Sequence, residues 1–194
     1  MNNLIITQED SNSTNQIVDG ILQLRHETFI QRLDWDIPSV NGRERDYFDD
    51  LQPYHIAVLD QNKSVVNGCW RALPTTGDYM LKSIFPELLQ GEAAPSCDDV
   101  WEISRFAVRK GSAEKEVGLL GNVTVDLVRS FHDFAIQNDI KAYVTVTTVA
   151  CERLLRQLGV SLRRMGAASA MQIGKERSVA LWIDVNQKLA IQRN

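Results

Sequence analysis

The order of predicted helices and strands makes this 194-residue chain an α/β protein, with a mixed sheet flanked by helices in three α-β-α layers. Three observations carry the prediction. Ile17, Ile21 and Leu24 recur at the spacing of an amphipathic helix. Two apolar runs flank a polar turn at residues 60–63, which is typical of a strand hairpin. Residues 141–149 are rich in β-branched side chains, as in a sheet strand.

Breaker residues and local patterns predict the remaining elements. The polar stretch at 35–50 contains Pro38 and Gly42 and predicts an ordered or ligand-gated loop. Gly159 is placed to end a helix, and Gly174 to turn between two strands. In chain order we expect a helix from about residue 13, strands at 55–59 and 65–72, a short irregular excursion at 86–95, a strand at 100–108, a loop at 111–116, a helix at 118–137, a strand at 141–149, a helix at 150–158 and two strands within 170–185. No repeat or linker divides the chain, so residues 1–194 are expected to form a single domain.

This order of elements is similar to that of the acetyltransferase (GNAT-like) superfamily. In that superfamily, the loop between the central strand and the long helix holds the diphosphate of coenzyme A. Here the corresponding loop carries Gly111, Gly118 and Gly121 but lacks the compact arginine-x-x-glycine-x-glycine cradle. The departure argues against a diphosphate being held there.

Composition narrows the function classes. The net charge is -4, the pI is near 5.4 and no dense basic stripe occurs, which argues against nucleic-acid binding. No apolar run is long enough to span a bilayer, and residues 1–13 lack the pattern of a signal peptide, so no membrane insertion is expected. Cys69, Cys97 and Cys151 are scattered, which suggests neither a zinc site nor disulfides and fits a cytoplasmic protein.

Charge is unevenly distributed along the chain. The first 60 residues are mainly acidic, whereas residues 151–177 are mainly basic. This split could place a cationic ligand near the acidic half and an acidic partner near the basic half, or it could mean two solvated faces.

Residues 24–50 combine aromatic rings with several carboxylates. Phe29 and Trp35 could stack on an aromatic group, while Glu44, Asp46 and Asp49 could pair with positive charge. S-adenosylmethionine, with its sulfonium, ammonium and adenine, suits such a site. The alternative is a capped helix followed by an acidic surface loop.

Two further stretches have both a functional and a structural interpretation. Trp70 with Phe85 could line an apolar tunnel or belong to the core. In the strand at 100–108, Glu102 and Arg105 are costly to bury unless they are paired or functional. A partly desolvated Glu102 could serve as a general base, and the alternative is a structural Glu–Arg pair. A bulge in this strand would interrupt its alternation of faces.

With these residues in place, the sequence closely resembles the acyl-homoserine-lactone synthases (autoinducer synthases) over nearly its whole length, and in particular their long-chain 3-oxoacyl subgroup. The resemblance rests on the runs GCWRALPTTGDYMLKSIFPELL, WEISRFAV and NDIKAYVTVTTVACERLL, and on two signatures. The first signature stands here as Arg25, Phe29, Trp35, Gly42, Glu44, Asp46 and Asp49, and the second as Arg71, Phe85, Glu102 and Arg105.

The resemblance implies synthesis of a quorum-sensing signal in two steps. The amine of S-adenosylmethionine attacks the thioester of an acyl-acyl-carrier protein, and the methionine carboxylate then closes the lactone and releases methylthioadenosine. S-adenosylmethionine is a substrate, so no cofactor and no metal are expected. The implied catalytic residues are Glu102 as first choice of base, then Glu44, with Arg105; the implied S-adenosylmethionine-binding residues are Arg25, Phe29, Trp35, Asp46, Asp49, Arg105 and Phe106.

The resemblance also implies an acyl site and a docking surface. The hydroxyl of Thr145 would favour a 3-oxo chain. The acyl-lining residues would be Trp70, Arg71, Met80, Phe85, Ser104, Thr145, Val146 and Val149, and the dock for the acidic carrier protein would be Arg153, Arg156, Arg163, Arg164 and Lys175. Three alternatives stay open: an acetyl-coenzyme A-dependent N-acetyltransferase, a synthase that uses acyl-coenzyme A, and a non-catalytic sensor of S-adenosylmethionine.

Overall fold

The structure is a computed structural model that describes residues 3–8, 12–111 and 121–185. Its contacts divide the chain into two compact units, which are described separately. Unit 1 comprises residues 1–72 and 105–130, and unit 2 comprises residues 73–104 and 131–194. Strands β5 and β6 and helix α3 each continue from one unit into the other.

Unit 1 is built on antiparallel strands. β1 pairs with β4, and β4 pairs with β5 through a register that sets Ile56 opposite Trp70. The hydrogen-bonded order is β1-β4-β5-β6. The elements are β1 (Asn3–Thr7), α1 (Asn12–Arg25), the π-helix η1 (His26–Arg32), β2 (Ser39–Val40), β3 (Arg43–Glu44), the 3₁₀ turn η2 (Tyr47–Asp49), β4 (Tyr54–Leu59), and parts of β5 (Val66–Pro74), β6 (Val100–Val108) and α3 (Asn122–Gln137).

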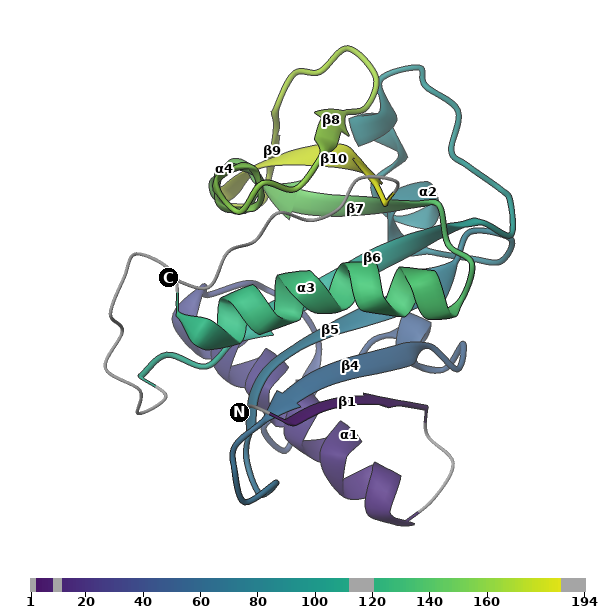
Figure 1. The fold of residues 1–194 in the computed structure, drawn as a ribbon. Coiled ribbons are helices and arrows are strands. Elements are labelled where there is room, and N and C mark those ends of the chain that lie inside the picture. Colours follow the sequence, from purple (N-terminus) through teal and green to yellow (C-terminus); the bar gives the residue numbers. More distant parts are fainter. Residues whose placement is uncertain (1–2, 9–11, 112–120, 186–194) are drawn as a thin grey trace. The chain divides into compact units, whose positions relative to one another are not determined.

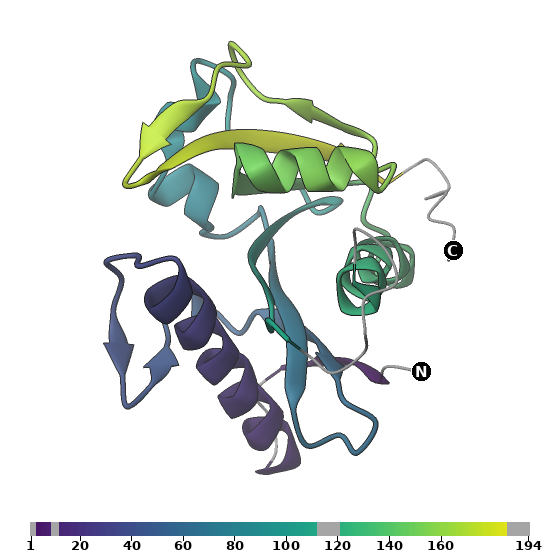
Figure 2. The same ribbon diagram turned by 90° about the vertical axis from the view of Figure 1, so that its left-hand side faces the viewer.

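Helices cover both faces of the strands of unit 1, and Figure 2 shows α1 and α3 on opposite sides of β5. On one face, Leu24 of α1 is fully buried in a cluster that includes Cys69. On the other, a Cβ at Gly68 would lie 2.6 Å from Leu127 of α3, and the Trp70 indole donates to the Ser130 hydroxyl at 2.8 Å. Because successive residues of a strand point to opposite faces, this alternation produces three layers.

Unit 2 has a parallel strand pair at its centre. β6 and β7 run parallel, and β10 pairs antiparallel with β7, β8 and β9. The order is β6-β7-β10-β8, with β9 also on β10. The elements that belong to unit 2 alone are α2 (Met80–Ser83), the 3₁₀ turn η3 (Pro86–Leu89), β7 (Ala142–Thr148), α4 (Val149–Gln157), β8 (Leu162–Arg164), β9 (Met171–Ile173) and β10 (Glu176–Asp184).

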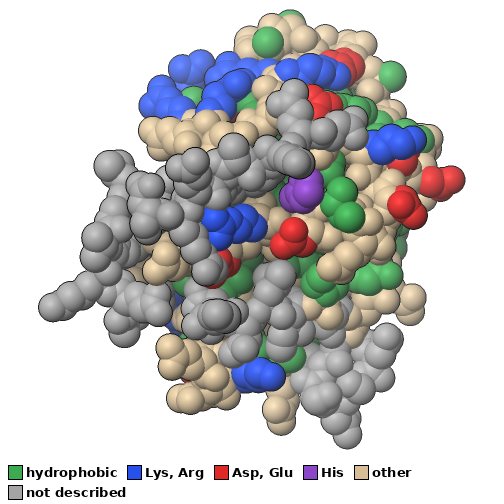
Figure 3. Space-filling model, viewed as in Figure 1, with side chains coloured by type: hydrophobic (Ala, Val, Ile, Leu, Met, Phe, Trp, Pro, Cys, Tyr) green, Lys and Arg blue, Asp and Glu red, His purple; other side chains and the backbone are tan. Residues whose placement is uncertain are grey.

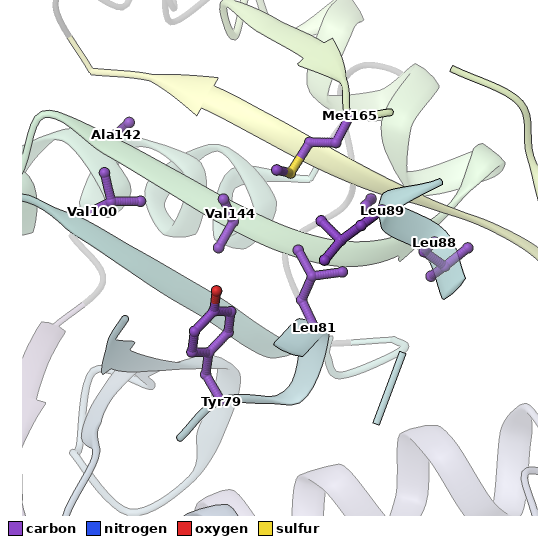
Figure 4. Packing of buried hydrophobic residues seen from close by; sticks show 9 residues of the cluster. Tyr79, Leu81, Leu88, Leu89, Val100, Ala142, Val144 and Met165 are labelled. Carbon is purple, nitrogen blue, oxygen red and sulfur yellow. The ribbon is translucent and has the colours of Figure 1, made fainter. Parts of the chain in front are cut away.

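The core of unit 2 joins α2 and η3 to the strands. Figure 4 shows Leu81 of α2 and Leu89 of η3 pointing toward Val144 of β7, with Met165 above them. Tyr79, which precedes α2, is fully buried in the same cluster, and its hydroxyl donates to the Pro95 carbonyl at 2.7 Å. The excursion between β5 and β6 is therefore packed onto the sheet.

Most predicted elements are confirmed, including the hairpin at β4–β5, the strand β6, the helix α4 and the two strands around Gly174. The α/β class with a mixed, helix-flanked, GNAT-like sheet is also confirmed. The prediction missed the short elements β1, α2 and β8. β1 and β8 are held by pairing with β4 and β10, and α2 by the burial of Met80 and Leu81, rather than by a strong local pattern. Most of the predicted loop at 111–116 and the start of the helix at 118–137 lie outside the described residues.

The expected interruption of β6 is present. Arg105 has a φ of +56°, in the left-handed region that breaks the regular alternation of a strand. Within the described part of the chain, none of the helices is both long and apolar enough to cross a membrane.

Candidate active site

Six charged side chains of unit 1 form a closed ring of ion pairs, here called the ion-pair ring. Around the ring, each guanidinium pairs with the two carboxylates beside it, and a longer contact of 4.0 Å between Arg25 and Asp46 crosses the ring. Three positive and three negative charges alternate, so the ring is neutral as a whole. In order around the ring, its members are Arg25, Glu44, Arg105, Asp46, Arg71 and Asp49.

The hydrogen bonds in the ring are short, and several pairs of side chains are joined by more than one of them. Arg25 binds both oxygens of Asp49, at 2.8 and 2.9 Å, and its Nε donates to Glu44. Arg71 bridges Asp46 and Asp49 at 2.6 and 2.8 Å. Arg105 donates to Asp46 at 2.7 Å. Paired donors of this kind give arginine a fixed orientation against a carboxylate.

Each ring member comes from an element that holds it in place. Arg25 ends α1, Glu44 ends β3 and Arg105 lies at the interrupted point of β6. The two aspartates belong to the turn η2, where they form a capping box: Asp46 accepts from the Phe48 amide, and Asp49 accepts from the Asp46 amide, both at 2.9 Å. The ring is thus preorganised by local structure.

Only one edge of the ring is accessible. The side chains of Arg25 and Glu44 are 0 % exposed, whereas those of Arg105 and Asp46 are 10 % and 15 % exposed. Arg105 and Asp46 are hydrogen-bonded to each other. The open edge therefore presents one cation beside one anion.

An aromatic pair adjoins the open edge. The rings of Phe29 and Trp35 stack with centroids 4.9 Å apart, and the Arg105 guanidinium lies 5.7 Å from the Phe29 centroid. Phe29 sits in the π-helix η1, and Trp35 donates its backbone N–H to the Phe29 carbonyl at 2.9 Å. π-helical turns often occur at functional sites.

Burial and pairing oppose each other in the ring. Burial raises the pKa of Asp49, but hydrogen bonds and charge from Arg25 outweigh this and hold it well below its ordinary value. Burial lowers the pKa of Arg25, and the same pairing with Asp49 and with Glu44 more than reverses that effect. For Arg105, burial dominates and lowers the pKa below its ordinary value.

Glu102, the first choice for general base, lies in unit 2 and is 1 % exposed. Its carboxylate oxygens accept from the backbone N–H groups of Met80 at 2.9 Å and Leu81 at 2.7 Å. These are the first residues of α2. Its role as base stays a prediction.

The residues predicted to line an acyl site belong to both units and are described within each unit. Phe85 and Val146 pack against the core cluster of unit 2. Thr145 is also buried, but as the neighbour of Val146 on β7 it points to the opposite face of the strand. Arg71 belongs to the ion-pair ring, and its contact with an acyl chain stays a prediction. Trp70 is a buried core residue of unit 1 that faces α3. Of the remaining predicted acyl-lining residues, Met80 is buried, and Ser104 and Val149 are partly buried. Phe106, which was predicted to bind S-adenosylmethionine, is also partly buried.

The predicted docking residues, here called the basic cluster, are Arg153, Arg156, Arg163, Arg164 and Lys175. Figure 3 shows basic side chains gathered over the part of unit 2 that carries α4 and β8. Two acidic residues hold three of them: Glu152 binds Arg156 at 3.0 Å and Arg164 at 2.7 Å, and Glu92 binds Arg163 at 2.8 Å.

Two kinds of partner for the arginines were not predicted from the sequence: an aromatic ring beside the ion-pair ring and the carboxylates that bind the basic cluster. Phe48 lies 5.6 Å from the Arg71 guanidinium, and its place within the run DYFDD was the available signal. Glu152 has the (i, i+4) spacing to Arg156 of a helical ion pair, which could have identified it. The pairing of Glu92 with Arg163 spans 71 residues, and no local pattern predicts it.

Comparison with known proteins identifies the family. The autoinducer synthase family matches residues 9–192. The chain is 41% identical to an acyl-homoserine-lactone synthase of Aliivibrio fischeri over 169 residues, which cover 87% of this chain and 86% of that protein. It is also 41% identical to an acyl-homoserine-lactone synthase of Pseudomonas aeruginosa over 172 residues, with 87% and 83% covered.

Solved structures agree with the sequence comparison. The crystal structure of the AHL synthase LasI superposes with a TM-score of 0.81 at 36% identity and covers 98% of this chain and 94% of that one. TofI, in a ternary complex with an inhibitor and MTA, gives a TM-score of 0.79 at 27% identity, with 96% and 93% covered. The family match and these relatives agree with the ion-pair ring and the stacked Phe29–Trp35 pair described above. The chain therefore belongs to the autoinducer synthase family and is an acyl-homoserine-lactone synthase, an acyltransferase.

Proposed function

We propose that the open edge of the ion-pair ring binds the amino-acid end of S-adenosylmethionine. The observation that carries this proposal is the hydrogen-bonded pair of Asp46 and Arg105, the two ring members with accessible side chains. A zwitterionic amino acid offers an ammonium for Asp46 and a carboxylate for Arg105. The Phe29–Trp35 pair next to this edge would contact the sulfonium and the adenine.

The buried members of the ion-pair ring hold the two residues of the open edge in position and do not contact the substrate themselves. Arg25, Glu44 and Asp49 are at most 3 % exposed and hold Arg105 and Asp46 in position. We therefore assign binding contacts to the edge and a positioning role to the buried members. The complex of the relative TofI with MTA supports an adenosyl ligand in this family.

In the first step, the amine of S-adenosylmethionine attacks the thioester carbonyl of the acyl donor. Its ammonium must first lose a proton, and a carboxylate is the expected acceptor, directly or through water. Glu102 remains our first choice, because Glu44, the second choice from the sequence, is fully buried between Arg25 and Arg105 and has the positioning role assigned above. The N–C bond forms, the C–S bond of the thioester breaks, and the thiol of the carrier leaves with a proton. Backbone N–H groups beside the interruption at Arg105 are candidate donors to the oxyanion.

In the second step, the methionine carboxylate displaces the sulfonium at its own γ-carbon. The new C–O bond closes the lactone while the C–S bond breaks, and methylthioadenosine leaves as a neutral sulfide. No proton transfer is needed, so the step depends on a folded-back substrate conformation. An edge that fixes the carboxylate against Arg105 would restrict that conformation.

The acyl donor is proposed to be a 3-oxoacyl-acyl-carrier protein of medium to long chain. Phe85 and Val146 pack on the same apolar core and would contact the chain, and the hydroxyl of Thr145 would bind the 3-oxo group. The basic cluster would attract the acidic carrier protein. A cytoplasmic location, where such carriers are used, is part of this proposal.

The test is a reconstituted reaction. The chain, S-adenosylmethionine and a 3-oxoacyl-acyl-carrier protein should yield an acyl-homoserine lactone and methylthioadenosine in equal amounts, measured by mass spectrometry. Asp46→Asn, which keeps the size of the edge residue and removes its charge, should raise KM for S-adenosylmethionine with little change in KM for the donor. Unchanged KM values would refute the proposed edge.

Donor preference needs a separate comparison. Acyl-coenzyme A with the same chain should react more slowly than the carrier-bound donor, and equal rates would remove the carrier protein from the proposal. Thr145→Val removes the hydroxyl and keeps the shape of the side chain. It should reduce the preference for 3-oxo over unsubstituted chains, whereas an unchanged ratio would show that Thr145 does not recognise the oxo group.

A further inference from the structure

We infer that Glu102 acts as a positioning residue that sets acyl-chain selectivity by fixing helix α2. This inference rests on the proposed function, because it concerns the acyl site of that reaction. It assigns to Glu102 a task that is independent of any proton transfer.

The contacts of Glu102 are directed at the start of α2. Its two carboxylate oxygens each accept one backbone N–H, from Met80 and from Leu81. The N–H groups at the start of a helix have no partner within the helix, and a carboxylate satisfies them strongly. Because Glu102 is 1 % exposed, this contact is made away from bulk water.

The helix held in this way carries apolar residues into the core of unit 2. Leu81 is fully buried among Val100 and Val144 of strands β6 and β7. A helix of four residues cannot be stable by itself, so its position depends on such anchors. A shift of α2 would therefore change the surface that α2 presents to the acyl chain.

The hydrogen bonds that begin at the Glu102 carboxylate continue through α2 to Phe85. The Met80 carbonyl accepts the N–H groups of Ile84 at 2.8 Å and Phe85 at 3.1 Å. A continuous hydrogen-bonded path thus runs from the Glu102 carboxylate through Met80 to Phe85, whose ring packs on the core of unit 2. Met80 and Phe85 are two of the proposed acyl-lining residues, so the same carboxylate fixes both.

Met80 offers a test that leaves the Glu102 carboxylate intact. Met80 is the first residue of α2, and Tyr79 before it is extended, with φ −156° and ψ 160°. Proline is tolerated at the first position of a helix and after an extended residue, but it has no N–H. Met80→Pro therefore removes one of the two donors to Glu102. Met80→Ala is the matched control, because it shortens the side chain and keeps the donor.

The measurement is the distribution of lactones that each variant makes from an equimolar mixture of carrier-bound acyl chains, with KM and kcat for one chain. We expect Met80→Pro to change the ratio of long to short products by about threefold or more relative to Met80→Ala. The change should appear in KM for the acyl donor, with KM for S-adenosylmethionine unchanged. Glu102→Gln should shift the distribution in the same direction, since its amide can accept only one of the two N–H groups.

Three results would overturn the inference or the function separately. If Met80→Pro and Met80→Ala give the same distribution, the anchor does not set selectivity. If Glu102→Gln lowers kcat by a factor of 100 or more, abolishes the pH dependence of kcat and leaves the distribution unchanged, Glu102 acts as a base alone. If the unaltered chain makes no lactone, the proposed function fails before selectivity can be measured. Circular dichroism of each variant verifies that the fold is retained.

Discussion

The ion-pair ring and the basic cluster use the same pairing of guanidinium with carboxylate in two different environments. In the ring, the side chains of Arg25 and Arg71 are at most 1 % exposed. In the basic cluster, those of Arg156 and Arg163 are 50 % and 52 % exposed. A buried pair cannot lose one partner without leaving a charge in a medium of low dielectric, whereas an exposed pair can exchange its partner for water or another protein.

The difference in environment corresponds to a difference in task. In the function proposed above, the ring fixes the geometry of a small-molecule site, where each group has one permitted position. The basic cluster presents cations whose intramolecular partners, Glu152 and Glu92, leave part of each guanidinium accessible. Such a surface suits a transient encounter with an acidic protein. The following predictions test this comparison, from the largest expected effect to the smallest.

Breaking the ring should cost the most stability. Asp49→Ala leaves Arg25 and Arg71 with fewer buried partners, and we expect the free energy of unfolding to fall by about 3–5 kcal/mol. Urea denaturation followed by circular dichroism measures the change. A loss below about 1 kcal/mol would mean that the ring is not a structural element.

The ring should also make the protein sensitive to acid. The pKa of Asp49 is lowered in the folded chain, so the stability it contributes is present above its ordinary pKa of 3.8 and is lost as the pH falls through the folded value. Unfolding free energies measured from pH 6 downward should decrease steeply below about pH 4. Asp49→Asn should flatten this decrease; an equally steep curve would assign the acid sensitivity to other groups.

The basic cluster should affect donor kinetics rather than stability. Arg153 is exposed and forms no ion pair with the other residues that the structure describes, so Arg153→Glu changes the surface without breaking an internal ion pair. We expect KM for the acyl-carrier protein to rise about three- to tenfold at low salt, and less at high salt. KM for a small acyl-pantetheine donor is the control and should not change. An unaltered KM for the carrier would exclude this surface as the dock.

An exposed ion pair next to the ring should show the smallest effect. Arg45 and Asp50 pair at 3.0 Å with side chains 39 % and 64 % exposed. Arg45→Ala should lower the unfolding free energy by less than about 1 kcal/mol, because water and salt screen such pairs. Compared with Asp49→Ala under the same conditions, it separates the effect of burial from that of charge. A loss equal to that of Asp49→Ala would contradict the role assigned to burial.

Local patterns in the sequence were enough to predict most of the fold. The periodicity of Ile17, Ile21 and Leu24, the turn at residues 60–63 and the β-branched run of β7 each depend on neighbours in the chain. Short elements such as α2 could not be predicted in this way, because a helix of four residues forms only where tertiary contacts such as those of Glu102 hold it.

The sequence by itself also determined which residue types make the candidate site, since the spaced arginines, carboxylates and aromatic rings were recognised by their resemblance to a family signature. Only the tertiary structure decided how they pair. It placed Arg71 in the ion-pair ring, and it directed the carboxylate of Glu102 at the backbone N–H groups of α2. The physical reason is that these pairings join residues from 19 to 61 positions apart, and folding alone determines which of them become neighbours in a buried environment.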